Sequence, residues 1–79
     1  MIPIKDFLNK IKWDSNLSEE DYTIYYFDRI ENKLLELRYK DIKRLEGNFI
    51  ITNINNKEIN VPLHRIRKVE KEGVVVWQR

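Results

Sequence analysis

The chain lacks cysteine altogether and has a single histidine among its 79 residues. Without cysteine it can form neither a disulfide nor a thiolate metal site, and one histidine needs several carboxylates beside it to hold zinc. Only two glycines are present, so no glycine-rich phosphate loop can be built. We therefore expect no metal and no other cofactor. The sequence also lacks a cysteine nucleophile and the paired histidines of a two-histidine phosphoesterase.

Long apolar runs are missing as well. No run approaches the roughly 20 residues that a membrane span requires, and residues 1–6 lack the long apolar region of a signal peptide. We expect a cytoplasmic protein with no membrane partner. A chain of this length is expected to form one domain, residues 1–79, which buries only about 60–65% of the surface that the unfolded chain exposes.

The N-terminal stretch has the apolar spacing of an amphipathic helix over roughly residues 3–13. Pro3 suits a first helical position, and apolar residues recur three and four positions apart, at Ile4, Phe7, Leu8 and Ile11. Trp13 ends this helix; we expect it to pack in the core, with stacking on a nucleobase as the alternative. Residues 14–21 are polar and acidic, and we expect a connection there with a single helical turn near Ser18.

The rest of the chain is rich in β-branched and aromatic residues, which are typical of strands, and turn signals separate the runs. Residues 40–46 stay open between a short strand and a helical turn, and no internal repeat is apparent. The pattern predicts an α+β domain whose helix packs on a twisted antiparallel sheet of about five to six strands. Periodicity does not decide whether this sheet closes into a small Sm-like or SH3-like barrel. The predicted strands span residues 22–29, 34–39, 49–52, 58–61, 65–69 and 74–78.

The first predicted strand has aromatic residues on both faces and ends at Asp28 and Arg29. Alternation places Tyr25 and Phe27 on one face and Tyr26 on the other. Two interpretations of the strand end stay open. In one, Asp28 and Arg29 make turn contacts or an ion pair. In the other, Arg29 offers a bidentate fork to a phosphate, while Asp28 orients it or accepts from a ribose hydroxyl.

Positive charge is concentrated at the C-terminal end of the chain. The net charge of +2 is too small to imply a nucleic-acid partner by itself, but residues 60–79 carry five basic and two acidic residues. The same end contains the single histidine, a proline and a tryptophan, within Val61–Lys68 and Val74–Arg79. Such a distribution is what an electrostatic footprint for phosphate would produce.

Four short motifs follow one another along the chain: Lys12-Trp13-Asp14, Tyr26-Phe27-Asp28-Arg29, Pro62-Leu63-His64-Arg65-Ile66 and Val75-Val76-Trp77-Gln78-Arg79. In this combination the chain resembles a small, mainly archaeal RNA-repair domain family that is proposed to recognise RNA ends carrying a cyclic phosphate. The resemblance covers nearly the whole chain. In that family the domain is found alone or fused to RNA-processing enzymes. The resemblance therefore implies RNA binding in RNA repair or processing, with an RNA-processing enzyme as a further partner.

The resemblance and the basic C-terminal end together imply a set of RNA-binding residues. His64 and Arg65 follow a chain-turning proline and leucine, and we expect them to bind the terminal phosphate, with Arg65 as the charged fork. Arg29, with Asp28 beside it, and Arg79 are second candidates, and Arg67 and Lys68 would contact adjacent phosphates. The candidates for stacking a splayed base are Tyr25, Trp77 and Trp13, although burial is an equal alternative for Trp77.

Two other functions stay open at this point. The apolar final strand, with Val74–Val76, could pair with a partner enzyme or with a second copy of the chain, which would make the protein an interaction or dimerisation module. A weak ribonuclease or cyclic phosphodiesterase would use His64 as a general base, and it would need a second acid–base group, for which Asp28 is the one candidate. The sequence assigns no catalytic residue.

Overall fold

One helix, α1 (Ile4–Trp13), opens the part of the chain that the computed structural model describes, which is residues 2–13 and 21–79. Ile4, Leu8 and Ile11 are buried, as their spacing predicts. Trp13 is 78% exposed, so the expectation that it packs in the core is wrong. It comes nine residues after Ile4, which at about 3.6 residues per turn places it on the opposite side of the helix. The predicted acidic connection with its helical turn falls largely on residues 14–20, outside the described residues.

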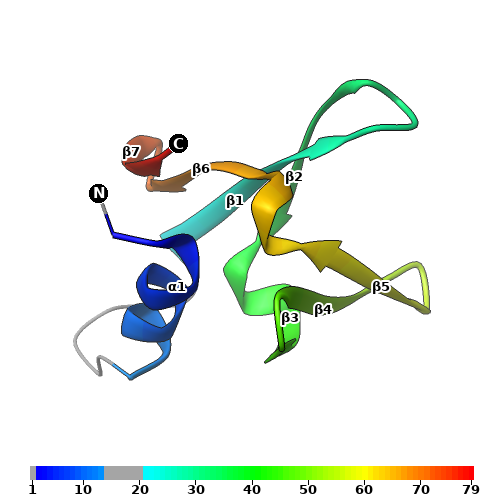
Figure 1. Cartoon of the computed structure of the whole chain (residues 1–79), viewed down its shortest axis with the longest axis horizontal. Coiled ribbons are helices and arrows are strands. Elements are labelled where there is room, and N and C mark those ends of the chain that lie inside the picture. The colour runs from blue at the N-terminus through cyan, green and yellow to red at the C-terminus, as the bar shows by residue number, and fades with distance from the viewer. Residues whose placement is uncertain (1, 14–20) are drawn as a thin grey trace.

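In residues 21–79, seven strands follow the helix (Figure 1). Each of the six predicted strands is present, with ends that differ by at most two residues. For residues 40–46 the sequence did not decide between a short strand and a helical turn. The segment contains both, because the last two residues of a 3₁₀ turn are followed by a strand. The strands are β1 (Tyr22–Asp28), β2 (Lys33–Arg38), β3 (Ile42–Glu46), β4 (Phe49–Ile54), β5 (Lys57–Pro62), β6 (Ile66–Lys71) and β7 (Val74–Gln78), and two of the 3₁₀ turns are η2 (Tyr39–Asp41) and η3 (Leu63–Arg65).

The strands form two antiparallel sheets, which corrects the expectation of one sheet with five to six strands. The four-stranded sheet has the order β2-β1-β6-β7, and the three-stranded sheet has the order β3-β4-β5. The hydrogen-bonded ladders of the described strands do not join the two sheets into a closed barrel. In Figure 1 the β1–β2 and β4–β5 hairpins extend toward the same side of the molecule, away from α1.

The sheets are separate because the chain turns at η2 and at η3 instead of continuing straight. Each 3₁₀ turn begins with a buried residue, Tyr39 or Leu63. The first residue of the following strand then donates its N–H to the carbonyl oxygen of that buried residue. We call residues 39–46 the first corner and residues 63–70 the second corner.

The two corners are also related in sequence, although no repeat was expected. The first corner reads Tyr-Lys-Asp-Ile-Lys-Arg-Leu-Glu and the second reads Leu-His-Arg-Ile-Arg-Lys-Val-Glu. Both have isoleucine fourth, basic residues fifth and sixth, and glutamate eighth, so Lys43 corresponds to Arg67 and Arg44 to Lys68. Only two of the eight positions are identical, so the repeat cannot be recognised from the sequence alone. It becomes apparent when the shared backbone turn is compared.

The hydrophobic core is shared by α1 and both sheets. The Tyr39 hydroxyl donates to the Leu8 carbonyl oxygen over 3.1 Å, and the rings of Phe7 and Tyr22 meet edge to face. These contacts hold the helix against the sheets. No helix among the described residues is long and apolar enough to cross a membrane. The most completely buried side chains are Leu8, Ile11, Ile24, Ile50, Thr52, Ile66 and Val69.

Turns lie at Gly47-Asn48, Asn55-Asn56 and Glu72-Gly73, between strands that the sequence predicted to be separated by turn signals. Asn55 and Asn56 have φ values of 52° and 66°, and two consecutive residues of this kind suit a two-residue hairpin turn. β5 ends at Pro62, as expected for a residue without a backbone N–H. The β5–η3 junction therefore lies where the proline predicted a change of direction.

Candidate nucleic-acid interface

Two arginines, Arg67 in the second corner and Arg79 at the C-terminal end, are held by backbone carbonyl groups of the second corner. Arg79 donates from Nε to the Ile66 oxygen over 3.0 Å and from Nη2 to the Leu63 oxygen over 3.3 Å. Arg67 donates from Nη1 to the His64 oxygen over 3.1 Å. Among the described residues, neither arginine forms an ion pair with a carboxylate. Carbonyl groups fix the guanidinium groups in place without neutralising them, so both positive charges stay available.

Lys68 stands beside these arginines and has a different environment. Its Nζ lies 3.1 Å from Glu70 Oε2 and 4.6 Å from the centre of the Tyr25 ring. The Tyr25 hydroxyl donates to the other Glu70 oxygen, Oε1, over 3.2 Å. Burial raises the pKa of Tyr25, and the hydrogen bond to Glu70 and that carboxylate's charge raise it further. The Tyr25 hydroxyl therefore stays protonated, and its ring is held in a fixed orientation beside the lysine.

The three cations line one pocket of about 450 Å³, which we call the basic pocket. Its apolar wall includes Phe27, whose ring centre lies 5.9 Å from the Arg67 guanidinium carbon. Sequence reasoning did not propose Phe27 for binding, although alternation placed it on the same face as Tyr25. The residues that line the basic pocket are Phe27, Leu34, Arg67, Lys68, Gln78 and Arg79.

His64 and Arg65, the two residues expected to share the terminal phosphate, line different hollows. His64 is exposed and borders a hollow of about 290 Å³ together with Lys5 and Arg79. Arg65 is half-buried and borders a pocket of about 380 Å³ in which Asp28 also lies. Arg79 therefore connects the hollow of His64 with the basic pocket, whereas Arg65 belongs to another pocket.

The end of β1 has a clear structural role. Asp28 Oδ1 accepts hydrogen bonds from the backbone N–H groups of Ile30, at 2.8 Å, and Glu31, at 3.3 Å. These are the turn contacts of the first interpretation. Arg29 is exposed in the same turn and makes no ion pair or side-chain hydrogen bond with the other described residues. The structure does not bring Arg29 into the basic pocket.

The two tryptophans are placed very differently. Trp77 is only 6% exposed, and its indole N–H donates to the Ile2 carbonyl oxygen over 2.8 Å. Burial, one of the two alternatives for Trp77, is therefore what the structure shows. The guanidinium carbon of Arg79 lies 5.4 Å from the Trp77 ring centre. Trp13 is exposed at the end of α1, with Lys12 Nζ 5.7 Å from its ring centre.

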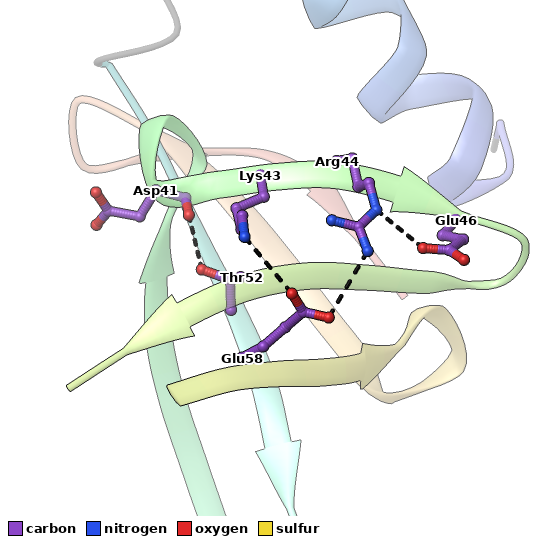
Figure 2. Close-up of polar contacts among 6 residues, drawn as sticks. All are labelled: Asp41, Lys43, Arg44, Glu46, Thr52 and Glu58. Atoms are coloured by element: carbon purple, nitrogen blue, oxygen red, sulfur yellow. Dashed lines mark hydrogen bonds and ion pairs between the residues drawn. The ribbon is translucent and has the colours of Figure 1, made fainter. Parts of the chain in front are cut away.

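In the first corner, the basic side chains form ion pairs with carboxylates (Figure 2). Lys43 Nζ lies 3.5 Å from Glu58 Oε2, and Arg44 Nη2 lies 3.6 Å from Glu58 Oε1. Arg44 Nε also bonds Glu46 Oε2 at 2.9 Å. The basic residues that correspond to Arg67 and Lys68 are thus neutralised by Glu58 on β5 and Glu46 on β3, whereas in the second corner Lys68 pairs with Glu70 and Arg67 does not pair with a carboxylate of the described residues. The second corner is the more suitable of the two for an anionic ligand.

A family model described as the MJ1316 RNA cyclic group end recognition domain matches residues 1–79. The chain belongs to this family. The match confirms the resemblance that the four sequence motifs indicated. In this MJ1316 family member, the second corner and the basic pocket lie within the residues that the family model matches.

Relatives of this MJ1316 domain carry the name UPF0248 protein. One, from Saccharolobus islandicus (strain L.S.2.15 / Lassen #1), is 28% identical over 79 residues, which cover 96% of this chain and 98% of the relative. Another, from Thermococcus sibiricus, is 35% identical over 78 residues, which cover 96% of this chain and 84% of the relative. No solved structure matches the chain.

Proposed function

We propose that this protein is an RNA-binding module that recognises RNA termini bearing a 2′,3′-cyclic phosphate, and that the terminal phosphate lies in the basic pocket. The observation that carries this proposal is that Arg67 and Arg79 are positioned by carbonyl groups and keep their charge. The description of the family supports the choice of an RNA end as ligand. The protein would act in RNA repair or processing, beside an enzyme that repairs or removes such ends.

The free N–H groups of the two arginines suit a phosphate. A guanidinium has five N–H donors, and the bonds to backbone carbonyls use two of them on Arg79 and one on Arg67. The remaining donors can bind the two non-bridging oxygens of a cyclic phosphate, and Lys68, although paired with Glu70, has further N–H donors beside them. Such bonds between charged groups are stronger than neutral ones.

Electrostatic attraction alone would favour an RNA end with a linear phosphate over one with a cyclic phosphate. A cyclic phosphate carries one negative charge, whereas a linear terminal phosphate carries about 1.5 to 2 near pH 7. A preference for the cyclic end therefore needs contacts that depend on shape. Phe27 and Leu34 supply an apolar wall beside the cations, and the carbon edge of the cyclic ester and its ribose can pack there without an unpaired hydroxyl.

The neighbouring groups extend the proposed interface. Tyr25, fixed beside Lys68, is the candidate for stacking a base, because single-stranded RNA readers use aromatic side chains in this way. His64 and Lys5 share a hollow with Arg79, and we assign the next phosphate along the RNA to them. Arg29, Trp13 and the buried Trp77 have no part in this proposal.

The test uses short RNAs of one sequence that end in 2′,3′-cyclic phosphate, 3′-phosphate, 2′-phosphate or 3′-hydroxyl. Fluorescence anisotropy at two salt concentrations measures their affinities for the wild type, Arg67→Gln and Arg79→Gln. Lys43→Gln is the matched control, because it removes the same charge at the corresponding position of the first corner. We expect the wild type and the control to bind the cyclic end at least about tenfold more tightly, about 1.4 kcal/mol, and both arginine variants to lose this preference.

Three outcomes would contradict the proposal. Equal binding of all four ends would mean that the ends are not distinguished. An equal loss in Lys43→Gln would mean that only overall charge matters. The third outcome is conversion of the cyclic end by the wild type but not by His64→Ala, which a gel of the RNA after incubation would detect. It would mean that the protein is an enzyme that uses His64.

A second candidate function, self-association, is favoured by the edge strands. The edge strands β2 and β3 carry several charged residues, and β5 carries charges and Pro62, all of which hinder pairing with another strand. β7 has no charged residue, and Val74, Val75 and Val76 are 65%, 43% and 41% exposed. Light scattering across a concentration series tests this candidate, with Val75→Lys expected to abolish any dimer; a monomer at all concentrations would exclude it.

A further inference from the structure

A second pocket lies between the two hairpins that extend away from α1, and we call it the inter-sheet pocket. Its volume is about 380 Å³, within the usual range for small-ligand sites. Ile30, at the tip of the β1–β2 hairpin, is 96% exposed, an unusual position for a large apolar side chain. The other apolar groups of the pocket come from both sheets and include Leu35, Ile54 and Ile59.

Arg65, one of the residues that line the inter-sheet pocket, has a hydrogen-bond donor without a partner among the described residues. The Nε atom of Arg65 is buried and makes no hydrogen bond to any other described residue. An unpaired buried N–H is unfavourable, so a ligand that offers an acceptor there gains a bond that the free protein lacks. Tyr26 lines the same pocket, and burial, with the charges of Asp28 and Glu31, raises its pKa. Its hydroxyl therefore stays protonated and can donate as well.

The charges of this pocket indicate which part of an RNA would enter it. Asp28 and Glu31 line it together with Arg65, so the carboxylates outnumber the cation. A phosphate would be repelled by these carboxylates, whereas an uncharged, flat group with acceptor atoms on its edge would not. Nucleobases have apolar faces, and every base carries at least one carbonyl oxygen or ring nitrogen that accepts a hydrogen bond.

Phe27 lines both the inter-sheet pocket and the basic pocket, so the two pockets adjoin at the end of β1. We propose that the inter-sheet pocket receives the base of the terminal nucleotide, while the phosphate of that nucleotide lies in the basic pocket. The base lies between the apolar side chains of the two hairpins and accepts a hydrogen bond from Arg65 Nε. This inference rests on the proposed function and adds the part of the RNA end that the basic pocket does not contact.

The experiment compares two RNAs with the same cyclic phosphate end, one with a normal terminal nucleotide and one with an abasic terminal ribose. Asn60→Trp places a large side chain in the pocket from an exposed position on β5, and Asn53→Trp on β4, outside the pocket, is the matched control. In the wild type and in Asn53→Trp we expect the abasic RNA to bind at least tenfold more weakly. In Asn60→Trp we expect both RNAs to bind equally and weakly.

A direct readout locates the base without any variant. In methyl NMR spectra, the signals of Ile30, Ile54 and Ile59 should shift with the complete RNA and stay in place with the abasic one. If the abasic RNA binds as tightly as the complete RNA, or if the base matters but these methyl signals do not move, the inference is wrong while end recognition stands. If neither RNA binds, the proposed function itself fails. A segment of a partner protein is the occupant instead if the methyl signals respond only to protein.

Discussion

The two corners have the same backbone turn and related sequences, yet their first basic residues, Lys43 and Arg67, have different partners. In the first corner, Lys43 and Arg44 reach Glu58 on β5 and Glu46 on β3, so their charges are neutralised (Figure 2). In the second corner, Lys68 likewise pairs with Glu70, but Arg67 is held by a backbone carbonyl and keeps its charge. A count of basic residues therefore does not locate an anion site. The partners of each cation decide whether its charge is available.

The isoleucine in each corner offers the test with the largest expected effect, because the two side chains differ in burial. Ile66 is completely buried, whereas Ile42 is half-buried. We expect Ile66→Ala to lower the free energy of unfolding by about 3 to 4 kcal/mol, and Ile42→Ala by about half as much, because cavity formation adds to the lost burial. Urea denaturation measures both values. Equal losses would show that the two corners contribute alike to the core.

The backbone carbonyl groups of the corners offer the next test. Thr52 is fully buried, and its hydroxyl donates to the Asp41 carbonyl oxygen over 2.7 Å, so a neutral group fixes the first corner. Thr52→Val keeps the shape and removes this donor, and we expect a loss of about 1 to 2 kcal/mol in the free energy of unfolding. Thr23→Val is the control, because the Thr23 hydroxyl makes no hydrogen bond with other described residues. A similar loss in both variants would contradict the role of this bond.

A carboxylate introduced into the basic pocket should give Arg67 of the second corner a partner of the kind that the first corner has. Gln78 lines the basic pocket beside Arg67 and Arg79, so Gln78→Glu places a negative charge among the cations. We expect the affinity for the cyclic RNA end to fall about tenfold, about 1.4 kcal/mol. Anisotropy titration measures this change, and Gln78→Ala controls for loss of the amide. If Gln78→Ala is as weak as Gln78→Glu, the charge is not the cause.

Removal of a carboxylate that pairs with the basic residues of the first corner should have the smallest effect. Glu58→Gln removes the partner of Lys43 and of one Arg44 nitrogen. The pairs are exposed, so we expect a loss of stability below about 1 kcal/mol. The freed charges should raise the affinity for RNA of any end about two- to threefold and increase its salt dependence. An increase limited to the cyclic end would contradict this expectation, because the first corner has no part in end recognition.

Local patterns in the sequence predicted the elements but not how they assemble. Helical spacing located α1, and alternation with turn residues located six strands and their faces. The division into two sheets was missed, because a 3₁₀ turn of three residues leaves no periodic signal and residues 40–46 look like either a strand or a helix. Trp13 was misplaced because its size was given more weight than its position on the helix.

The candidate site was predicted only in part. The uneven charge and the motifs pointed to the C-terminal end of the chain, and Arg67, Lys68 and Arg79 from that end line one pocket. Adjacent residues such as His64 and Arg65 were expected to act together, but a 3₁₀ turn directs them to different hollows. Carbonyl groups as the partners of the arginines could not be foreseen, because their positions depend on the folded backbone.

One ladder has a consequence for how this molecule folds. Among the described strands, β1 and β6 are the only paired strands that are distant in the chain; all other ladders join neighbours in sequence. Closing a long loop costs entropy before its contacts form, so we expect the hairpins to form first and β1–β6 to pair late. Phe27 comes from β1 and Arg67 from β6, so the basic pocket exists only after this step. A partly folded chain would have no RNA site, and bound RNA would select and stabilise the completely folded molecule.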